Sequence, residues 1–213
     1  MVHAPVAAPM TAAERIARDF TLLLPPGWAR IPLDGRVPLR VKNLVTERVA
    51  DVPVEQRETL RAALTRELTA VLESAARQGG LDVLLSVAPV AGQPVPASGL
   101  VTHLAGQGNG DALDSLVGTL AAGSGTSSVR EIGVVEVAAG PAVRRLTTRR
   151  ERVDGQGDLP GGVLTVTQVD YFVPLPGTRD LLVLTFTTPI EQLAPPLVQL
   201  FDVMGGSLRW VTR

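Results

Sequence analysis

The last fifty residues of the chain place the strongest constraint on its fold. Two apolar runs with β-strand character, Val163–Val173 and Leu181–Thr187, are joined by the turn-forming segment Pro-Leu-Pro-Gly-Thr-Arg-Asp. Apolar residues at helical spacing follow as far as Leu208, and they begin after Thr188-Pro-Ile-Glu191, which has the spacing of a capping box. The segment therefore predicts a β-hairpin that leads into an amphipathic helix, with Pro195-Pro196 delaying the regular helix to about Pro196.

Strand and helix patterns of the same kind fill the rest of the chain. A helix is predicted over Val54–Arg77, where apolar residues recur every three or four positions, and a shorter helix is predicted after Asp111. The segment 34–51 has mixed polarity and predicts neither state. The inward stripe of the long helix comprises Leu60, Leu64, Leu68, Val71, Leu72 and Ala75, and that of the short helix comprises Leu113, Leu116, Val117 and Leu120. Strands are predicted over Phe20–Leu24, Trp28–Leu33, Leu81–Pro89, Val95–Ala105, Ser128–Ala139 and Ala142–Val153.

The order of these elements predicts the fold class. Strands that follow one another directly form hairpins, and hairpins build antiparallel sheets. We therefore expect an α+β fold, an antiparallel β-sheet with helices packed on it, formed by residues 19–213 as a single domain. Residues 1–18 are expected to be a flexible N-terminal tail or a short helix.

Composition excludes several classes of function. The 213 residues contain no cysteine, which rules out disulfides, thiolate zinc sites, iron–sulfur clusters and a cysteine nucleophile. The net charge of -1 provides no general attraction for nucleic acid or for an anionic membrane. The longest uncharged run is interrupted by proline and glycine, so membrane insertion is not expected. We expect a cytoplasmic protein with no cofactor.

Three places in the chain carry a resemblance to a known family: two motifs, and the long hairpin that precedes the last helix, as in that family. Phe20-Thr-Leu-Leu-Leu-Pro-Pro-Gly-Trp28 resembles the opening of the PsbP-like superfamily, and Phe201-Asp-Val-Met-Gly-Gly-Ser-Leu-Arg-Trp210 resembles its closing helix. That superfamily includes the photosystem II extrinsic subunit, a Ran-binding nuclear import factor, LpqN-type lipoproteins, and chaperones for type VI secretion effectors. The resemblance implies a PsbP-like fold and binding in place of catalysis. It transfers no site residues, the chain lacks the cysteine of a lipoprotein anchor, and the segment Gly106–Ser128 has no counterpart.

Some local patterns admit a chemical interpretation beside a plain structural one. The glycine-rich loop Gly106–Asp111 lies where phosphate loops occur, but a carboxylate at the helix start repels phosphate, so we favour a turn. Asp154-Gly-Gln-Gly-Asp158 lacks the further acidic ligands that calcium needs. An enzyme would have to use His103 with carboxylates such as Asp170 or Asp180, and a deep polar pocket joining them would favour that alternative.

Five arginines on one predicted strand form the main candidate for partner binding. Side chains alternate between the faces of a strand, so Arg145 and Arg149 share one face and the other three share the opposite face. They would protect a sheet edge or bind an acidic protein partner. Apolar residues beside the last hairpin complete the candidate surface, and we expect Leu175 to be exposed there. The full set comprises Arg144, Arg145, Arg149, Arg150, Arg152, Tyr171, Phe172 and Leu175.

These observations favour a non-catalytic module that binds another protein. The most concrete form is an accessory factor or chaperone of a bacterial secretion or contractile machine, which holds a segment of its partner on the sheet. Formation of a homodimer or a larger assembly is compatible with the same surface. The alternatives are a carrier of a small apolar ligand, held between sheet and helices, and a structural subunit of a larger assembly.

Overall fold

The computed structural model describes residues 19–50, 52–89, 95–107, 113–123, 125, 127–153 and 162–211. Within these ranges the chain forms a seven-stranded antiparallel sheet in the order β2-β3-β4-β8-β7-β6-β5 and a two-stranded ribbon, β1-β9. The strands are β1 (Phe20–Thr21), β2 (Trp28–Pro32), β3 (Gly80–Ser86), β4 (Ser98–Leu104), β5 (Ser128–Val137), β6 (Gly140–Val153), β7 (Gly162–Pro174), β8 (Leu181–Thr188) and β9 (Arg209–Trp210). The helices are α2 (Val37–Arg48), α3 (Val54–Arg77), α4 (Leu113–Ala122), the 3₁₀ turn η1 (Glu191–Leu193) and α5 (Ala194–Gly206). The predicted α+β class, with helices packed on an antiparallel sheet, is confirmed.

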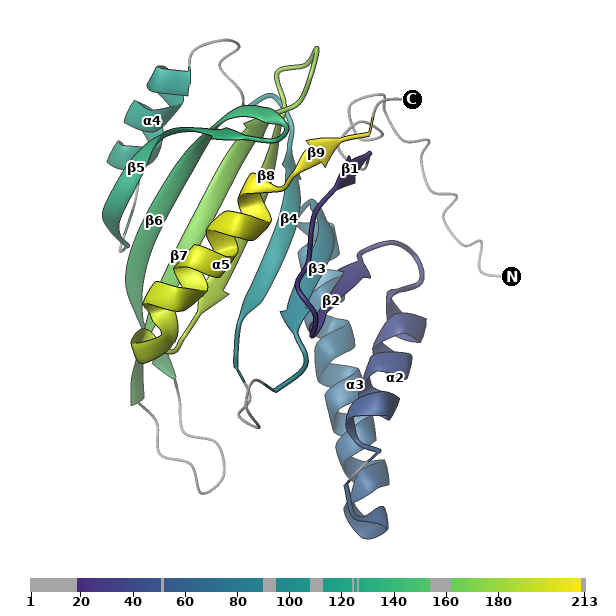
Figure 1. Cartoon of the computed structure of the whole chain (residues 1–213). Helices are drawn as coiled ribbons and strands as arrows, with labels where there is room; N and C mark the ends of the chain where they lie inside the picture. Colours follow the sequence, from purple (N-terminus) through teal and green to yellow (C-terminus); the bar gives the residue numbers. More distant parts are fainter. Residues whose placement is uncertain are drawn as a thin grey trace.

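Helices cover both faces of the large sheet (Figure 1). Helix α5 crosses one face, where Phe201 stacks on Phe186 of β8 with ring centroids 5.3 Å apart. Because side chains alternate along β8, Leu184 faces the α5 core, whereas Val183 belongs to the cluster beneath α4. The pair α2–α3 packs against β2 and β3 and contributes a third cluster, which is centred on Val41. Among the described residues, none of the helices is long and apolar enough to cross a bilayer.

The predicted hairpins and the long helix are confirmed in the structure. Strands β7 and β8 pair from Pro174↔Leu181 to Thr167↔Thr188, and β5 and β6 pair through the turn that precedes Gly140. Helix α3 spans the predicted residues, and α5 starts after a single 3₁₀ turn, with prolines at its first positions. The predicted inward stripe of α3 is wrong at Leu60 and Val71, which are 38% and 63% exposed.

Three other features differ from the predictions. Segment 34–51 contains α2, whose buried residues Val37, Val41 and Val45 recur every four positions. Valine is a weak helix former, and this stripe is narrow, so the pattern was not recognised in the sequence. The first strand stops at Thr21, and α5 ends at Gly206, because Phe20 and Trp210 pair in the β1-β9 ribbon. The tail 1–18 lies outside the described residues.

Candidate functional site

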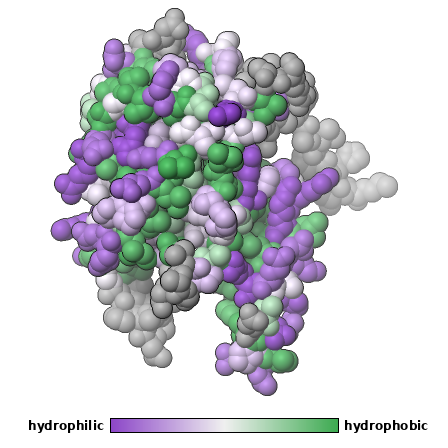
Figure 2. All heavy atoms as spheres, viewed as in Figure 1, coloured by the Kyte–Doolittle hydropathy of each residue, from purple (hydrophilic) through white to green (hydrophobic). Residues whose placement is uncertain are grey.

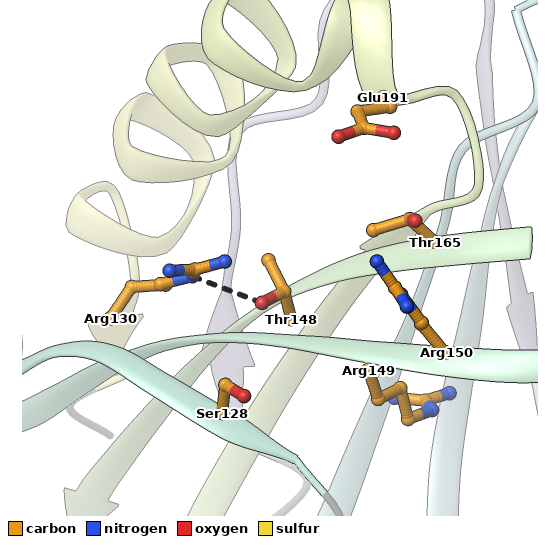
Figure 3. Close-up of a pocket in the computed structure, with 7 residues that line it drawn as sticks. All are labelled: Ser128, Arg130, Thr148, Arg149, Arg150, Thr165 and Glu191. Atoms are coloured by element: carbon orange, nitrogen blue, oxygen red, sulfur yellow. Dashed lines mark hydrogen bonds between the residues drawn. The ribbon is translucent and has the colours of Figure 1, made fainter.

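A polar cleft of about 420 Å³ opens between the ends of β5, β6 and β7 and the start of η1. Figure 3 shows its lining side chains, and we call this cleft the arginine groove. Figure 2 shows hydrophilic residues along the left side of the molecule, where Figure 1 places β5 and β6. The groove is lined by Ser128, Arg130, Thr148, Arg149, Arg150, Thr165 and Glu191.

The register of the sheet gathers these residues. Ser128 pairs with Thr148 between β5 and β6, and Arg150 pairs with Thr165 between β6 and β7. Paired residues of antiparallel strands share a face, so all four lie on the α5 side of the sheet. The pairing register shifts between Val129 and Glu131. Arg130, the residue between them, also lines this groove.

Two arginines provide the positive charge of the groove. Arg130 donates from Nε to Oγ1 of Thr148 at 3.1 Å, and Arg150 extends toward Thr165 and η1 (Figure 3). Both are exposed, and among the described residues neither forms an ion pair with a carboxylate. Glu191 forms the opposite wall (Figure 3). The groove therefore offers guanidinium donors on one side and a carboxylate acceptor on the other.

The remaining predicted arginines have other surroundings. Arg149 points away from the groove (Figure 3), pairs with Glu151 at 2.5 Å and donates to the side-chain oxygen of Gln168. Arg152 is exposed near the end of β6. Arg144 and Arg145 lie earlier on β6, on opposite faces, and both form ion pairs with carboxylates of this chain. Of the five arginines, the structure therefore places only Arg150 with its guanidinium in the groove.

Arg144 belongs to a cluster beneath α5. Its guanidinium donates to both carboxylate oxygens of Asp202, at 2.8 and 3.0 Å, and to Glu131 at 2.9 Å. Tyr171 donates its hydroxyl to the same Asp202 at 2.5 Å. Burial raises the pKa of Tyr171, and the hydrogen bond to the Asp202 carboxylate raises it further. Burial alone would lower the pKa of Arg144, but its bonds to Asp202 raise it above the usual value.

Arg145 lies on the opposite face and neutralises a buried carboxylate. Asp170 is 1% exposed and accepts hydrogen bonds from Arg145 at 2.9 Å, from Gln168 at 2.8 Å and from Thr185 at 2.8 Å. Since buried charges must be paired and hydrogen-bonded, this network accounts for the burial of Asp170. Asp170 therefore has a structural role, and the structure does not join it with His103.

The apolar members of the predicted surface are buried within the chain. Tyr171 packs toward α5, and Phe172 packs beneath α4. Leu175, which we expected to be exposed, is 2% exposed and belongs to the α5 core, so that expectation is wrong. The hairpin closes by a bond from the Leu175 backbone N–H to the Asp180 carbonyl, which turns the leucine side chain inward. The side chains at these three positions are buried, so their exposure does not support contact with a partner.

His103 contacts a single carboxylate. Its Nε2 lies 2.8 Å from Asp180 Oδ2, and the other oxygen of Asp180 accepts the backbone N–H of Gly106 at 2.8 Å. The Gly106 N–H and then His103 hold the pKa of Asp180 below its usual value. This bridge ties the β7–β8 turn to the end of β4. Residues 108–111 of the glycine-rich loop and residues 154–158, which were weighed as a calcium site, lie outside the described residues. The described residues include no cluster suited to a metal.

Sequence reasoning missed most of the groove. Arg130, Thr148, Thr165 and Ser128 occur singly in the sequence, on three strands, and only the register brings them together. Glu191 was interpreted as part of a helix cap. The only usable signal was the cluster of arginines near the end of one strand, which includes Arg150.

Comparisons with known proteins find distant likenesses of structure. No protein-family model matches the chain, and no curated protein matches it. It is similar to the Ran-binding protein Mog1p of Saccharomyces cerevisiae, with 15% identity, a TM-score of 0.45, and coverage of 91% of this chain and 90% of that one. A cyanobacterial PsbP from Synechocystis is similar with 11% identity, a TM-score of 0.40, and coverage of 91% and 87%. A mutant of Mog1 gives 14% identity, a TM-score of 0.44, and coverage of 91% of each chain.

These likenesses are too distant to indicate what the chain binds. A relation to LpqN-type lipoproteins or to effector chaperones stays a prediction. The fold class itself rests on the strand order and helix packing of this chain.

Proposed function

We propose that the chain is a non-catalytic binding module that holds an extended, acidic segment of another protein in the arginine groove. The observation that carries the proposal is that Arg130 and Arg150 face one polar cleft without carboxylate partners among the described residues. Guanidinium groups bind carboxylates through strong, charge-assisted hydrogen bonds. An acidic side chain of the partner would form an ion pair with both arginines.

The composition of the groove favours a peptide over a simple anion. The Glu191 carboxylate accepts hydrogen bonds from the N–H groups of a polypeptide, which a fully ionised anion does not offer. The hydroxyls of Ser128, Thr148 and Thr165 both donate and accept, which suits the alternating groups of an extended backbone. Strand β5 ends the large sheet, and no further strand pairs with its outer edge in the described part of the chain. An edge strand of this kind accepts an extended segment by strand addition.

A wider role is proposed on the sequence resemblance alone. The module would act as an accessory factor or chaperone of a bacterial secretion or contractile machine, in the cytoplasm. Homodimerisation, or incorporation into a larger assembly as a structural subunit, would use the same edge of the sheet.

Fluorescence anisotropy with a labelled decapeptide of alternating threonine and glutamate tests the proposal. The wild-type chain is expected to bind it, with affinity falling as salt rises from 50 to 300 mM, and to bind the threonine–lysine counterpart far more weakly. The double variant R130Q/R150Q should lose about tenfold in affinity, since exposed charge pairs contribute on the order of 1 kcal/mol.

The matched control is R66Q/R77Q, which removes the same charge from exposed positions of α3. It should bind the acidic peptide like the wild type. Equal losses of affinity in both double variants would show that only the net charge of the protein matters. That result would overturn the groove as the binding site. Absence of binding to the wild type at low salt would overturn the acidic-segment proposal itself.

A further inference from the structure

A second cleft lies at the root of the α2–α3 pair, and it shares no lining residue with the arginine groove, although its Ile190 precedes Glu191 in the chain. One part, of about 250 Å³, is lined by apolar side chains of α2, α3 and β3, and it includes Leu44, Leu64, Leu68 and Leu85. These four leucines are half-buried, so each leaves part of its surface at the cleft. A neighbouring part, of about 480 Å³, continues beside Ala88, Pro89, Val95, Pro96 and Ile190.

The two parts meet at three shared residues. Arg48, Ser86 and Val87 line both, so we treat them as one feature and call it the α2–α3 groove. Arg48 ends α2 and is the one charged residue among those that line either part. It is exposed, and it forms no ion pair with a carboxylate among the described residues. The groove is therefore apolar with a single cation, which suits an apolar ligand that carries one negative charge.

The walls of the groove argue against a polypeptide occupant. A peptide in an apolar cleft needs partners for its N–H and C=O groups, because an unpaired buried amide is costly. The backbone donors of this wall are already used: Ser86 N–H bonds to Ala97, and the N–H groups of Val87 and Ala88 both bond to Gly27. An alkyl chain has no such requirement and gains free energy from each methylene that leaves water.

We propose that the α2–α3 groove binds a single-chain anionic amphiphile, a fatty acid, whose carboxylate pairs with Arg48 and whose tail lies along the leucines. The guanidinium fixes the head group through charge-assisted hydrogen bonds. The tail covers the half-buried leucines of α2, α3 and β3. This site is independent of the acidic-segment proposal and would coexist with it.

Displacement of a fluorescent fatty acid by unlabelled acids of eight to fourteen carbons tests the proposal. Each added methylene should tighten binding roughly fourfold until the groove is filled, after which affinity should level off. Methyl esters of the same acids should bind about tenfold more weakly, because they lack the charge that Arg48 recognises. Affinity that is independent of chain length would overturn the proposal.

Paired variants locate the site. Arg48→Gln should weaken binding about tenfold, whereas Lys42→Gln, which removes a charge from α2 outside this groove, should have no effect. Val87→Trp should block the junction of the two parts and abolish binding, and Val71→Trp, at a 63% exposed position of α3, should leave it unchanged. Wild-type binding by the Val87→Trp protein would overturn the site, provided its circular dichroism shows a folded chain.

Photo-crosslinking keeps the test decisive if Val87→Trp does not fold. A diazirine-bearing fatty acid bound to the wild-type chain should label peptides from segments 44–68 and 85–89. Labelling scattered over the surface, or confined to α5, would overturn the proposal. Binding of an apolar peptide probe in the same displacement assay, without binding of any fatty acid, would reassign the groove to a protein partner.

Discussion

Asp202 links α5 to strands β6 and β7 through its side-chain hydrogen bonds. Its carboxylate accepts from Arg144 on β6 and from Tyr171 on β7. Without it, the 14% exposed side chain of Arg144 retains only Glu131, and the hydroxyl of Tyr171 loses its partner. A buried donor left unpaired costs more than the bond itself was worth.

Replacement of Asp202 by alanine should therefore lower the free energy of unfolding by about 2 kcal/mol. The partial exposure of Asp202 keeps the effect below that of a fully buried charge. Urea denaturation at neutral pH measures it. Glu67→Ala, an exposed change on α3, should shift stability by less than about 0.5 kcal/mol. An Asp202→Ala protein as stable as this control would contradict the assigned role.

Asp180 gives the chain a dependence on acid pH. Its folded-state pKa lies below the unfolded value because the Gly106 N–H and His103 favour the carboxylate. The stabilisation is therefore fully present above the unfolded pKa of about 4, and it is lost as the pH falls through the folded pKa. Wild-type stability should exceed that of Asp180→Asn at pH 6, and the difference should shrink between pH 4 and pH 2. A pH-independent difference would show that the carboxylate charge contributes nothing.

At the scale of elements, a single glycine sets how closely α5 approaches the sheet. A β-carbon on Gly205 would lie 2.4 Å from the ring of Tyr171, whereas one on Gly206 would meet nothing within 4 Å. The two glycines are adjacent in the same helix. Substitutions at the two positions therefore distinguish the effect of packing from the effect of helix propensity.

Gly205→Ala should destabilise the chain by about 1–3 kcal/mol, because the ring or the helix must move. Gly206→Ala should be neutral, or stabilising by up to about 1 kcal/mol, since alanine is the better helix former. Thermal unfolding followed by circular dichroism compares the two. If both variants melt at the same temperature, the close approach of α5 to Tyr171 is not a feature of the folded chain.

At the scale of the whole molecule, a two-stranded ribbon joins the beginning and end of the described chain. Phe20 pairs with Trp210, and the backbone N–H of Val211 bonds to the Asp19 carbonyl at 2.8 Å. Phe20 is 4% exposed and belongs to the α5 core. The indole N–H of Trp210 is buried, and no hydrogen-bond partner for it is found in the described structure.

These facts predict a large loss of stability for one substitution in the ribbon and a small loss for another. Phe20→Ala should destabilise by about 3–5 kcal/mol, because a buried aromatic ring is removed from the core. Trp210→Phe should cost less than about 1 kcal/mol, because the lost contacts are offset by removal of an unpaired buried donor. Denaturant midpoints provide the comparison. A large loss in Trp210→Phe would mean that the indole N–H does have a partner.

The projecting α2–α3 pair should open before the rest of the molecule. Figure 1 shows the N-terminal part of α3 extending beyond the sheet, and Leu72, in its second half, is the buried residue of this helix. Local opening is easiest where few apolar contacts are lost. Hydrogen exchange followed by mass spectrometry should therefore show faster exchange in peptides from 54–63 than in those from 66–77. Uniform protection along α3 would point to contacts that cover its first half.

The sequence by itself determined the elements that rest on short-range signals. Alternation and turn residues predicted the two long hairpins, and apolar residues at every third or fourth position predicted α3. The arginines of β6 were assigned correctly to two faces. These features depend on backbone geometry that neighbours in the chain control, so they are legible without tertiary information. Helix α2 was not predicted because a stripe of three valines is a weak local signal.

Only the tertiary structure decided which of those residues are available to a partner. Arg144 and Arg145 carry the same charge as Arg150, but Asp202 and Asp170 neutralise them from elements 58 and 25 positions away. Leu175 was turned inward by closure of its own hairpin, and the arginine groove arose from the register of three strands. Burial and these two ion pairs depend on contacts between residues distant in the chain, so no local pattern identifies Asp202 or Asp170 as the partner.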